Sequence, residues 1–256
     1  TGRWVKEKLL TWGVKDPRYQ SRVRAQFPTQ SEWNIYPLTW LEAAGARPLE
    51  SVPDGDLVAG IDPAGDGADE FVVKVRSGCR LIASGAWADE SAWEKADRLL
   101  LDHGGPKAFA SLNIDADGLG YGYVKRCQAN GYRVVACHAQ EAAKDTERFA
   151  RAKDEWHFAL RDRCEQELIA GLDEEAIAQL ACLLWEFGPR STTQVVSKAK
   201  MREKGIPSPD HAEAVMLAFA PIATGTTPVT LGGDPAPPRE PGRGTMFIDR
   251  RGGRKR

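Results

Sequence analysis

The order of strand-like and helical segments is the feature that most constrains the fold of this chain. Three β-rich apolar segments come first, and the short turn at Ser77-Gly78 joins the second to the third, which favours an antiparallel meander. A helix, a fourth strand, a second helix and a fifth strand follow. Strands are expected at residues 57–61, 70–76, 80–87, 109–115 and 132–137. The order predicts an α/β fold with a mixed five-stranded sheet flanked by helices.

The helices are predicted from apolar spacing and from the residues that end them. Apolar side chains recur at helical intervals over residues 91–103, and Gly104-Gly105-Pro106 ends that segment. A second helix is expected to follow the glycines at 118–122 and to end near Asn130. Further helical segments are expected at 146–168, 173–187 and 209–219, with a short strand at 193–196.

Composition and charge set broad limits on what the chain does. The net charge is -1, so no overall basic field indicates nucleic-acid binding. The five cysteines are scattered without zinc-binding spacing, which is typical of reduced thiols in a cytosolic protein. No apolar run approaches the roughly 20 residues of a membrane-spanning helix. We therefore expect a soluble intracellular protein with no membrane partner.

Three regions differ in composition. Residues 1–50 hold four of the eight tryptophans among charges and helix breakers, and we expect a linker or extension that packs onto another domain. Residues 51–222 carry the predicted sheet and helices. Residues 223–256 are rich in Gly and Pro and end in a basic cluster, which predicts a disordered tail.

Three acids stand where strands end or a helix begins. Asp62 follows the first strand, Asp115 follows the fourth, and Asp210 begins the last helix, so the expected fold brings them together. Magnesium and manganese prefer such carboxylate oxygens as ligands. A pair of these ions supplies the activated water, the charge neutralisation and the leaving-group stabilisation that phosphodiester hydrolysis requires. The pattern predicts a two-metal nuclease in which Asp62 bridges the ions.

Other residues near these acids are secondary candidates for the metal site. On a continuing strand Asp117 would share a face with Asp115. Glu213 lies in the same first helical turn as Asp210. His211 is also a candidate ligand, although helical geometry turns it about 100 degrees away from Asp210.

Two lysines precede the last helix, Lys198 and Lys200. An ammonium group binds a phosphate as a point charge, so both are candidates for DNA binding. A solvated surface pair is the alternative.

Every acid also has an ordinary structural explanation. Asp62 can cap the turn that follows it, and Asp115 can be a polar strand end. Ser208 is a good helix N-cap, and the helix dipole favours acids such as Asp210 and Glu213 in the first turn. These explanations describe a non-catalytic module.

The three acidic motifs, in this order, resemble those of the C-terminal nuclease domain of tailed-phage terminase large subunits. The motifs are residues 60–69, residues 114–122, and Ser197-Lys198 together with residues 208–214. The resemblance implies a ribonuclease H-like fold and catalytic, metal-binding carboxylates at Asp62, Asp115 and Asp210. Glu213 is a departure, because the family more commonly has aspartate there.

The resemblance also implies a function and partners. It implies an endonuclease that uses two Mg²⁺ or Mn²⁺ ions to cut concatemeric double-stranded DNA during packaging, in the cytoplasm of an infected bacterium. The implied protein partners are the portal, the small terminase subunit and the ATPase domain of its own full-length chain. Residues 16–19 and 22–28 look like the segment that joins ATPase to nuclease. No phosphate-loop motif occurs in this chain, so we do not expect ATP hydrolysis from it.

Two alternatives stay open. Another ribonuclease H-like enzyme, of the resolvase or transposase type, would use the same acids on branched DNA or in strand transfer. A non-catalytic module that docks on DNA or on the portal would use them as turn and cap residues. The basic tail at 239–256 either contacts the portal or DNA, or merely keeps the chain soluble.

Overall fold

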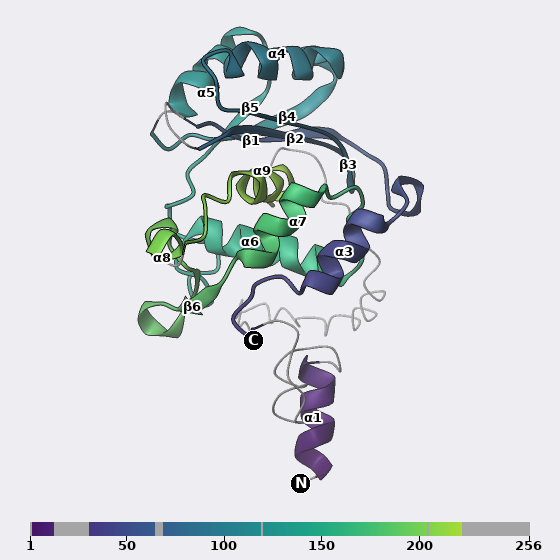
Figure 1. The fold of residues 1–256 in the computed structure, drawn as a ribbon, viewed down its shortest axis with the longest axis vertical. Coiled ribbons are helices and arrows are strands. Elements are labelled where there is room, and N and C mark those ends of the chain that lie inside the picture. The colour runs from purple at the N-terminus through teal and green to yellow at the C-terminus, as the bar shows by residue number, and fades with distance from the viewer. Residues whose placement is uncertain (1, 13–30, 65–68, 119, 204, 222–256) are drawn as a thin grey trace, which may run out of the picture. The chain divides into compact units, whose positions relative to one another are not determined.

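The computed structural model describes residues 2–12, 31–64, 69–118, 120–203 and 205–221. A five-stranded sheet in the order β3-β2-β1-β4-β5 forms its centre (Figure 1). β1 pairs antiparallel with β2, and β2 with β3, whereas β1–β4 and β4–β5 are parallel. The predicted meander with added parallel strands is confirmed. The strands are β1 (Leu57–Asp62), β2 (Phe71–Ser77), β3 (Arg80–Trp87), β4 (Phe109–Asp115) and β5 (Val134–Cys137).

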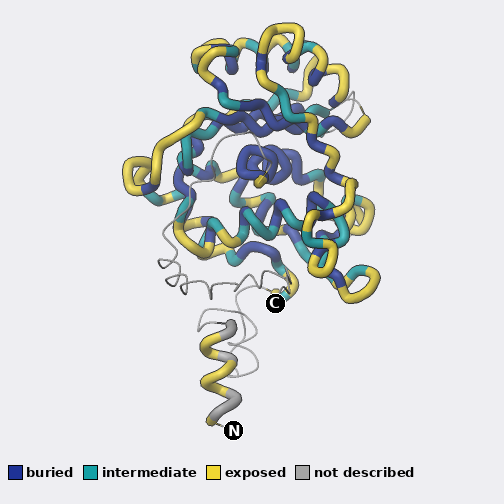
Figure 2. Tube along the Cα trace, turned by 180° about the vertical axis from the view of Figure 1, so that it is seen from behind, coloured by how far each residue is buried: buried dark blue, intermediate teal, exposed yellow. Residues whose placement is uncertain are grey.

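Helices cover both faces of the sheet (Figure 1). α4 (Ala92–Asp102) and α5 (Gly120–Ala129) lie on one face. α9 (Asp210–Phe219) lies on the other and is backed by α3 (Leu38–Ala46), α6 (Ala152–Glu165) and α7 (Glu174–Cys182). All residues of α9 are buried, and Figure 2 shows this helix enclosed between the sheet and the other helices.

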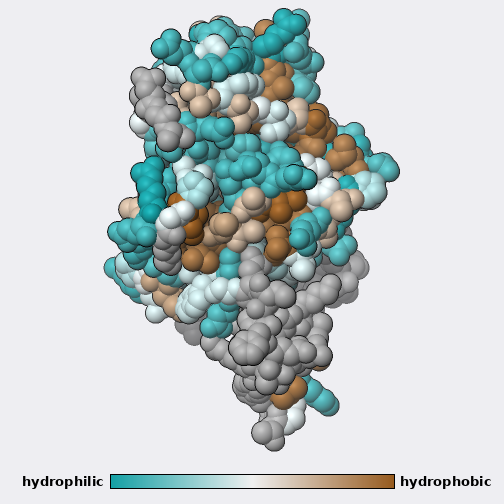
Figure 3. Space-filling view, in the orientation of Figure 1, coloured by the Kyte–Doolittle hydropathy of each residue, from teal (hydrophilic) through white to brown (hydrophobic). Residues whose placement is uncertain are grey.

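The two sides of the sheet have separate apolar cores. Side chains of β1, β2 and β4 pack with those of α4 and α5 on one side, with Ile61, Leu112 and Tyr123 fully buried. On the other side α3, α6, α7 and α9 form a second core. Burying each large apolar side chain contributes about 1.5–3 kcal/mol, so both layers are firmly held. Hydrophilic side chains cover most of the visible α4 and α5 layer (Figure 3).

Gly60 allows α9 to lie directly on the central strand. A Cβ atom added there would be 2.1 Å from the carbonyl oxygen of Ala214 and 2.2 Å from the amide nitrogen of Ala218. No side chain fits into such a gap. The first acidic motif therefore begins with a glycine that sets the distance between β1 and α9.

The predicted helix over residues 173–187 is wrong at its end. α7 stops at Cys182, and β6 (Trp185–Phe187) pairs antiparallel with β7 (Thr193–Val195) across the short 3-10 turn η3 (Pro189–Ser191). Trp185 instead packs on Trp33, with ring centroids 5.1 Å apart.

The helix expected from residue 146 begins later, at Ala152. Residues 146–148 form a turn instead, and Phe149 makes an isolated bridge to Thr193 of β7. The backbone N–H of Arg151 donates to the Asp154 side chain and starts the helix there. The remaining elements are α1 (Gly2–Trp12), α8 (Lys198–Glu203) and the 3-10 turns η1 (Leu49–Ser51) and η2 (Gly105–Lys107).

Part of the expected N-terminal extension belongs to the second core. Leu41 and Ala44 are fully buried, and the N–H of Ile35 donates to the carbonyl of Leu183. The domain boundary at residue 51 stays a prediction. Residues 16–19 and 22–28 and the tail at 223–256 lie outside the described residues. Among the described helices, none is long and apolar enough to cross a membrane.

Candidate active site

Acidic side chains gather at one edge of the sheet. Asp62 ends β1 and Asp115 ends β4, and because these strands are parallel both acids lie at the carboxyl end, where α/β folds commonly bind ligands. Asp210 and Glu213 come from the first turn of α9, which packs across β1. The charges of Asp115, Asp210 and Glu213 all act on the Asp62 carboxyl. The structure therefore brings the predicted acids together.

The cluster is short of positive charge. Burial raises the pKa of Asp62 well above its usual value, and the charges of Glu213, Asp115 and Asp210 raise it further while Lys198 lowers it. Burial also raises the pKa of Asp115, as do the charges of Asp117 and Glu213. A bound cation would relieve both the burial of charge and the repulsion.

The Lys198 ammonium group acts on the carboxyl groups of Asp62, Asp115 and Glu213. Its Nζ lies 4.0 Å from Asp210 Oδ1. Burial lowers the pKa of Lys198, but the surrounding negative charges raise it above its usual value. These charges belong to Glu213, Asp62, Asp210 and Asp115. The ammonium group thus lies among the carboxylates.

Lys200 has a different environment from Lys198. Its Nζ lies 2.9 Å from both carboxylate oxygens of Glu186, which is on β6. The two lysines that were candidates for DNA binding are therefore not equivalent.

Asp210 is held by hydrogen bonds to both oxygens. The backbone N–H of Glu70 donates to Oδ2 over 2.9 Å, and the Ser208 hydroxyl donates to Oδ1 over 2.5 Å. The expectation that Ser208 caps the backbone of α9 is wrong, because its hydroxyl binds the Asp210 side chain instead.

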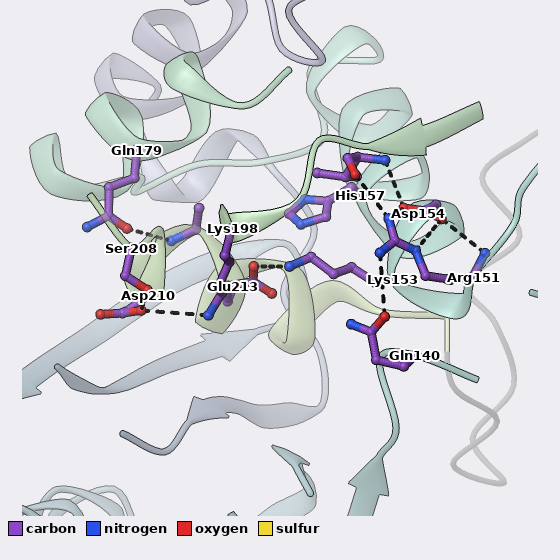
Figure 4. A network of polar contacts seen from close by, with 12 residues as sticks. Gln140, Arg151, Lys153, Asp154, His157, Gln179, Lys198, Ser208, Asp210 and Glu213 are labelled. Carbon is purple, nitrogen blue, oxygen red and sulfur yellow. Dashed lines mark hydrogen bonds and ion pairs between the residues drawn. The ribbon is translucent and has the colours of Figure 1, made fainter. Parts of the chain in front are cut away.

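Gln179 of α7 provides the cap for α9. Its Oε1 accepts the N–H groups of His211 and Ala212 over 2.7 and 3.2 Å, and Figure 4 shows it beside Ser208 and Asp210. This contact fixes the start of the helix that carries two of the acids. Nothing in the sequence near Gln179 indicated the role.

Glu213 forms a buried ion pair with Lys153 of α6 (Figure 4). Burial opposes ionisation of Glu213, but the ammonium groups of Lys153 and Lys198 hold its pKa below the usual value. Glu213 is therefore ionised next to Asp62. Sequence reasoning did not identify Lys153.

The other secondary candidates have partners outside the cluster. The Asp117 side chain lies 3.1 Å from Nδ1 of His138, and its N–H donates to Asp115 Oδ1 over 3.0 Å. Nε2 of His211 lies 3.3 Å from the Glu70 carboxylate. Asp69, also in the first motif, pairs with Arg202 at 3.5 Å. Asp66 lies outside the described residues.

Carboxylates are suitable ligands for a hard divalent cation, and burial together with the neighbouring acids raises the pKa of Asp62. In the described ranges, however, no three His, Cys, Asp or Glu side chains are arranged to hold one ion as they stand. The protein's own donors engage these acids, since Ser208 binds Asp210 and Lys153 binds Glu213. A bound cation would compete with these donors for the carboxylate oxygens.

Comparison with known proteins shows the fold. No family model and no curated protein matches the chain. Among solved structures, the nuclease domain of the large terminase subunit gp2 of bacterial virus Sf6 matches with a TM-score of 0.65 and 20% identity, over 74% of this chain and 100% of that one.

Terminase nucleases of two further phages also match. The nuclease of thermophilic phage G20c has a TM-score of 0.52 and 12% identity, over 75% of this chain and 98% of that one. The domain from Thermus phage P74-26 has a TM-score of 0.50 and 12% identity, over 73% of this chain and 94% of that one. The Sf6 domain has been solved with manganese, and the G20c nuclease with magnesium and with cobalt. The chain shares the fold of these domains.

Proposed function

We propose that this chain is the nuclease domain of a phage terminase large subunit and that it hydrolyses phosphodiester bonds of double-stranded DNA with divalent cations. The observation that carries the proposal is the gathering of Asp62, Asp115 and Asp210 at one sheet edge, in a fold shared with terminase nucleases. Because one fold can host many functions, the acid cluster matters more than the fold alone.

Asp62, Asp115 and Asp210 hold two Mg²⁺ or Mn²⁺ ions in this proposal. The ions supply a nucleophile activated near neutral pH, neutralise charge on the phosphate and stabilise the leaving oxygen. Asp62 would serve both ions, and the action of the charges of Asp115, Asp210 and Glu213 on its carboxyl supports this role. Metals bound to related folds, manganese in the Sf6 domain and magnesium in the G20c nuclease, support this choice of ions.

In this proposal Lys198 binds DNA, whereas the hydrogen-bonding groups around Asp210 hold the acids in place. Lys198 lies beside the acids and is half exposed, so it contacts the phosphate of bound DNA as a point charge. The hydrogen bonds from Ser208 and from the Glu70 N–H orient Asp210. Gln179 fixes the backbone from which Asp210 and Glu213 project.

The biological setting follows from the same proposal. The substrate is concatemeric DNA in the cytoplasm of an infected bacterium. The partners are the portal protein, the small terminase subunit and an ATPase domain of the same full-length chain. Support comes from the solved neighbours, each a nuclease from a large terminase subunit.

The test is plasmid nicking in Mn²⁺ by the wild type and by Asp62→Asn. We expect the variant to lose nicking and to keep its fold, measured by circular dichroism. Asp56→Asn is the matched control, because Asp56 is exposed just before the same strand. Undiminished nicking by Asp62→Asn would overturn the proposal, and a strong preference for four-way over linear DNA would favour a resolvase.

A further inference from the structure

Lys153 and His157 of α6 lie next to Glu213 of the acid cluster. The two residues are four apart, so they lie one above the other on one face of the helix. Lys153 pairs with Glu213, and the charges of both Glu213 and Lys153 act on the His157 ring. Figure 4 shows His157 beside this ion pair.

Tyr36 determines which nitrogen of His157 carries the hydrogen. The phenol oxygen lies 2.9 Å from Nδ1 and 2.9 Å from the carbonyl oxygen of His157. A carbonyl can only accept, so the single phenol hydrogen is donated to it. Nδ1–H must then donate to the phenol oxygen, which leaves the lone pair on Nε2.

His157 Nε2 is therefore a hydrogen-bond acceptor. It is buried and has no partner among the described residues. Burial lowers the pKa of His157 to about 3, so the ring is neutral near physiological pH. Buried polar atoms are rarely left unpaired, and such an atom needs an explanation. The Lys153 ammonium, one helical turn away, carries three donors.

We propose that Lys153 exchanges Glu213 for His157 Nε2 when Glu213 turns toward a divalent cation. The inference rests on the proposed function, because it needs a cation at the acid cluster. Taking Glu213 away would leave the buried Lys153 ammonium without a hydrogen-bond acceptor, which is costly. His157 provides that acceptor, so Lys153 and His157 are positioning residues and Glu213 is a ligand of the loaded site only.

The first test follows the His157 Nε2 resonance by NMR in protein with ¹⁵N-labelled histidine while Mg²⁺ is added, and calorimetry measures Mg²⁺ binding in parallel. We expect an upfield shift of Nε2 on binding, because the lone pair gains a hydrogen bond. In Glu213→Gln, whose neutral amide holds the ammonium weakly, we expect the shifted position without Mg²⁺. If calorimetry shows that Mg²⁺ binds while the Nε2 resonance does not shift, the proposed exchange of partners by Lys153 is overturned. No Mg²⁺ binding at all overturns the proposed function instead.

The second test compares two substitutions of the acceptor. His157→Phe removes it, whereas His157→Gln keeps an acceptor oxygen. We expect His157→Phe to weaken Mg²⁺ binding about 10- to 100-fold, the usual effect of losing a residue that supports a metal ligand. His157→Gln is expected to bind close to the wild-type affinity. Wild-type affinity in His157→Phe, measured by calorimetry, overturns the proposal.

Discussion

The side-chain oxygen of Gln179 accepts the backbone N–H of His211 over 2.7 Å, so a residue of α7 caps the helix that carries Asp210 and Glu213. The first N–H groups of any helix lack partners within it. No side chain near the start of α9 in sequence provides the cap. The position of two acids thus depends on a helix that contributes no acid to the cluster.

Replacing Gln179 by alanine removes this cap. We expect a loss of about 1 kcal/mol in the free energy of unfolding, as for other helix caps. For a domain of this size that corresponds to roughly 2–4 °C in Tm, together with slower DNA cutting. Gln128→Ala, on the exposed side of α5, is the control. An unchanged Tm and rate in Gln179→Ala would contradict the prediction.

Gly60→Ala tests the close approach of β1 and α9. The added methyl group would overlap the backbone of Ala214 and Ala218, which cannot move aside as a flexible side chain can. We expect a loss of about 1–3 kcal/mol or more in unfolding free energy, and loss of nicking because the two elements separate. Gly122→Ala is the control, since its methyl group meets only the ring of Trp93. Chemical denaturation of both variants gives the comparison.

Comparing Asp115→Asn with Asp117→Asn tests which of these two neighbouring acids is the metal ligand. Asp115 is acted on by Glu213 within the cluster, whereas the Asp117 side chain pairs with His138. We expect Asp115→Asn to lower the cutting rate by more than about 100-fold, beyond the usual effect of residues that only support a ligand. Asp117→Asn should stay within about tenfold of the wild type. The reverse order of rates would show that Asp117 is the ligand.

Lys198→Ala and Lys200→Ala are compared in DNA binding at several salt concentrations, in an Asp62→Asn background that prevents cutting. Lys198 lies among the acids, whereas Glu186 holds Lys200. We expect Lys198→Ala to reduce the slope of log affinity against log salt by about 0.9, the value for one phosphate contact. Lys200→Ala should keep the wild-type slope. Equal slopes in all three proteins would remove Lys198 from the DNA contact.

The pH dependence of stability reports on His157. Burial lowers the pKa of His157 to about 3 in the folded protein, below the value of about 6.5 expected on unfolding. Between these values the unfolded state binds more protons, so folding stability falls as the pH falls, by at most about 1.4 kcal/mol per unit. His157→Gln should lose this part of the slope. Urea denaturation between pH 7 and pH 5 measures it, and parallel curves for both proteins would contradict the assignment.

The sheet was predictable because its strands carry local signals. β1 is apolar up to Asp62, and the turn at Ser77-Gly78 is short enough to define a hairpin. The end of α7 was not predictable from helical spacing alone, because Trp185 is drawn out of the helix by Trp33, a residue far away in sequence. Long-range packing of this kind has no local signal.

The acids at the sheet edge were predictable from their places after strands and at a helix start, and their catalytic role stays a prediction. Their partners were not predictable. The helices α6 and α7 pack against α9, and only this packing brings their side chains to the site. Gln179 then caps α9, and Lys153 and His157 lie near Glu213. A single sequence shows which residues can ionise, but it does not show which donors will reach them.

The burial of α9 has a consequence for the newly made protein. This helix packs across β1, β2 and β4, yet it is the last described element to leave the ribosome. Because a domain generally folds as a unit, the sheet lacks the helix that covers β1, β2 and β4 until residues 210–219 have been made. A chain that ends before residue 210 has Asp62 and Asp115 but lacks Asp210 and the helix that covers this face of the sheet, so we expect such a product to be inactive in plasmid nicking.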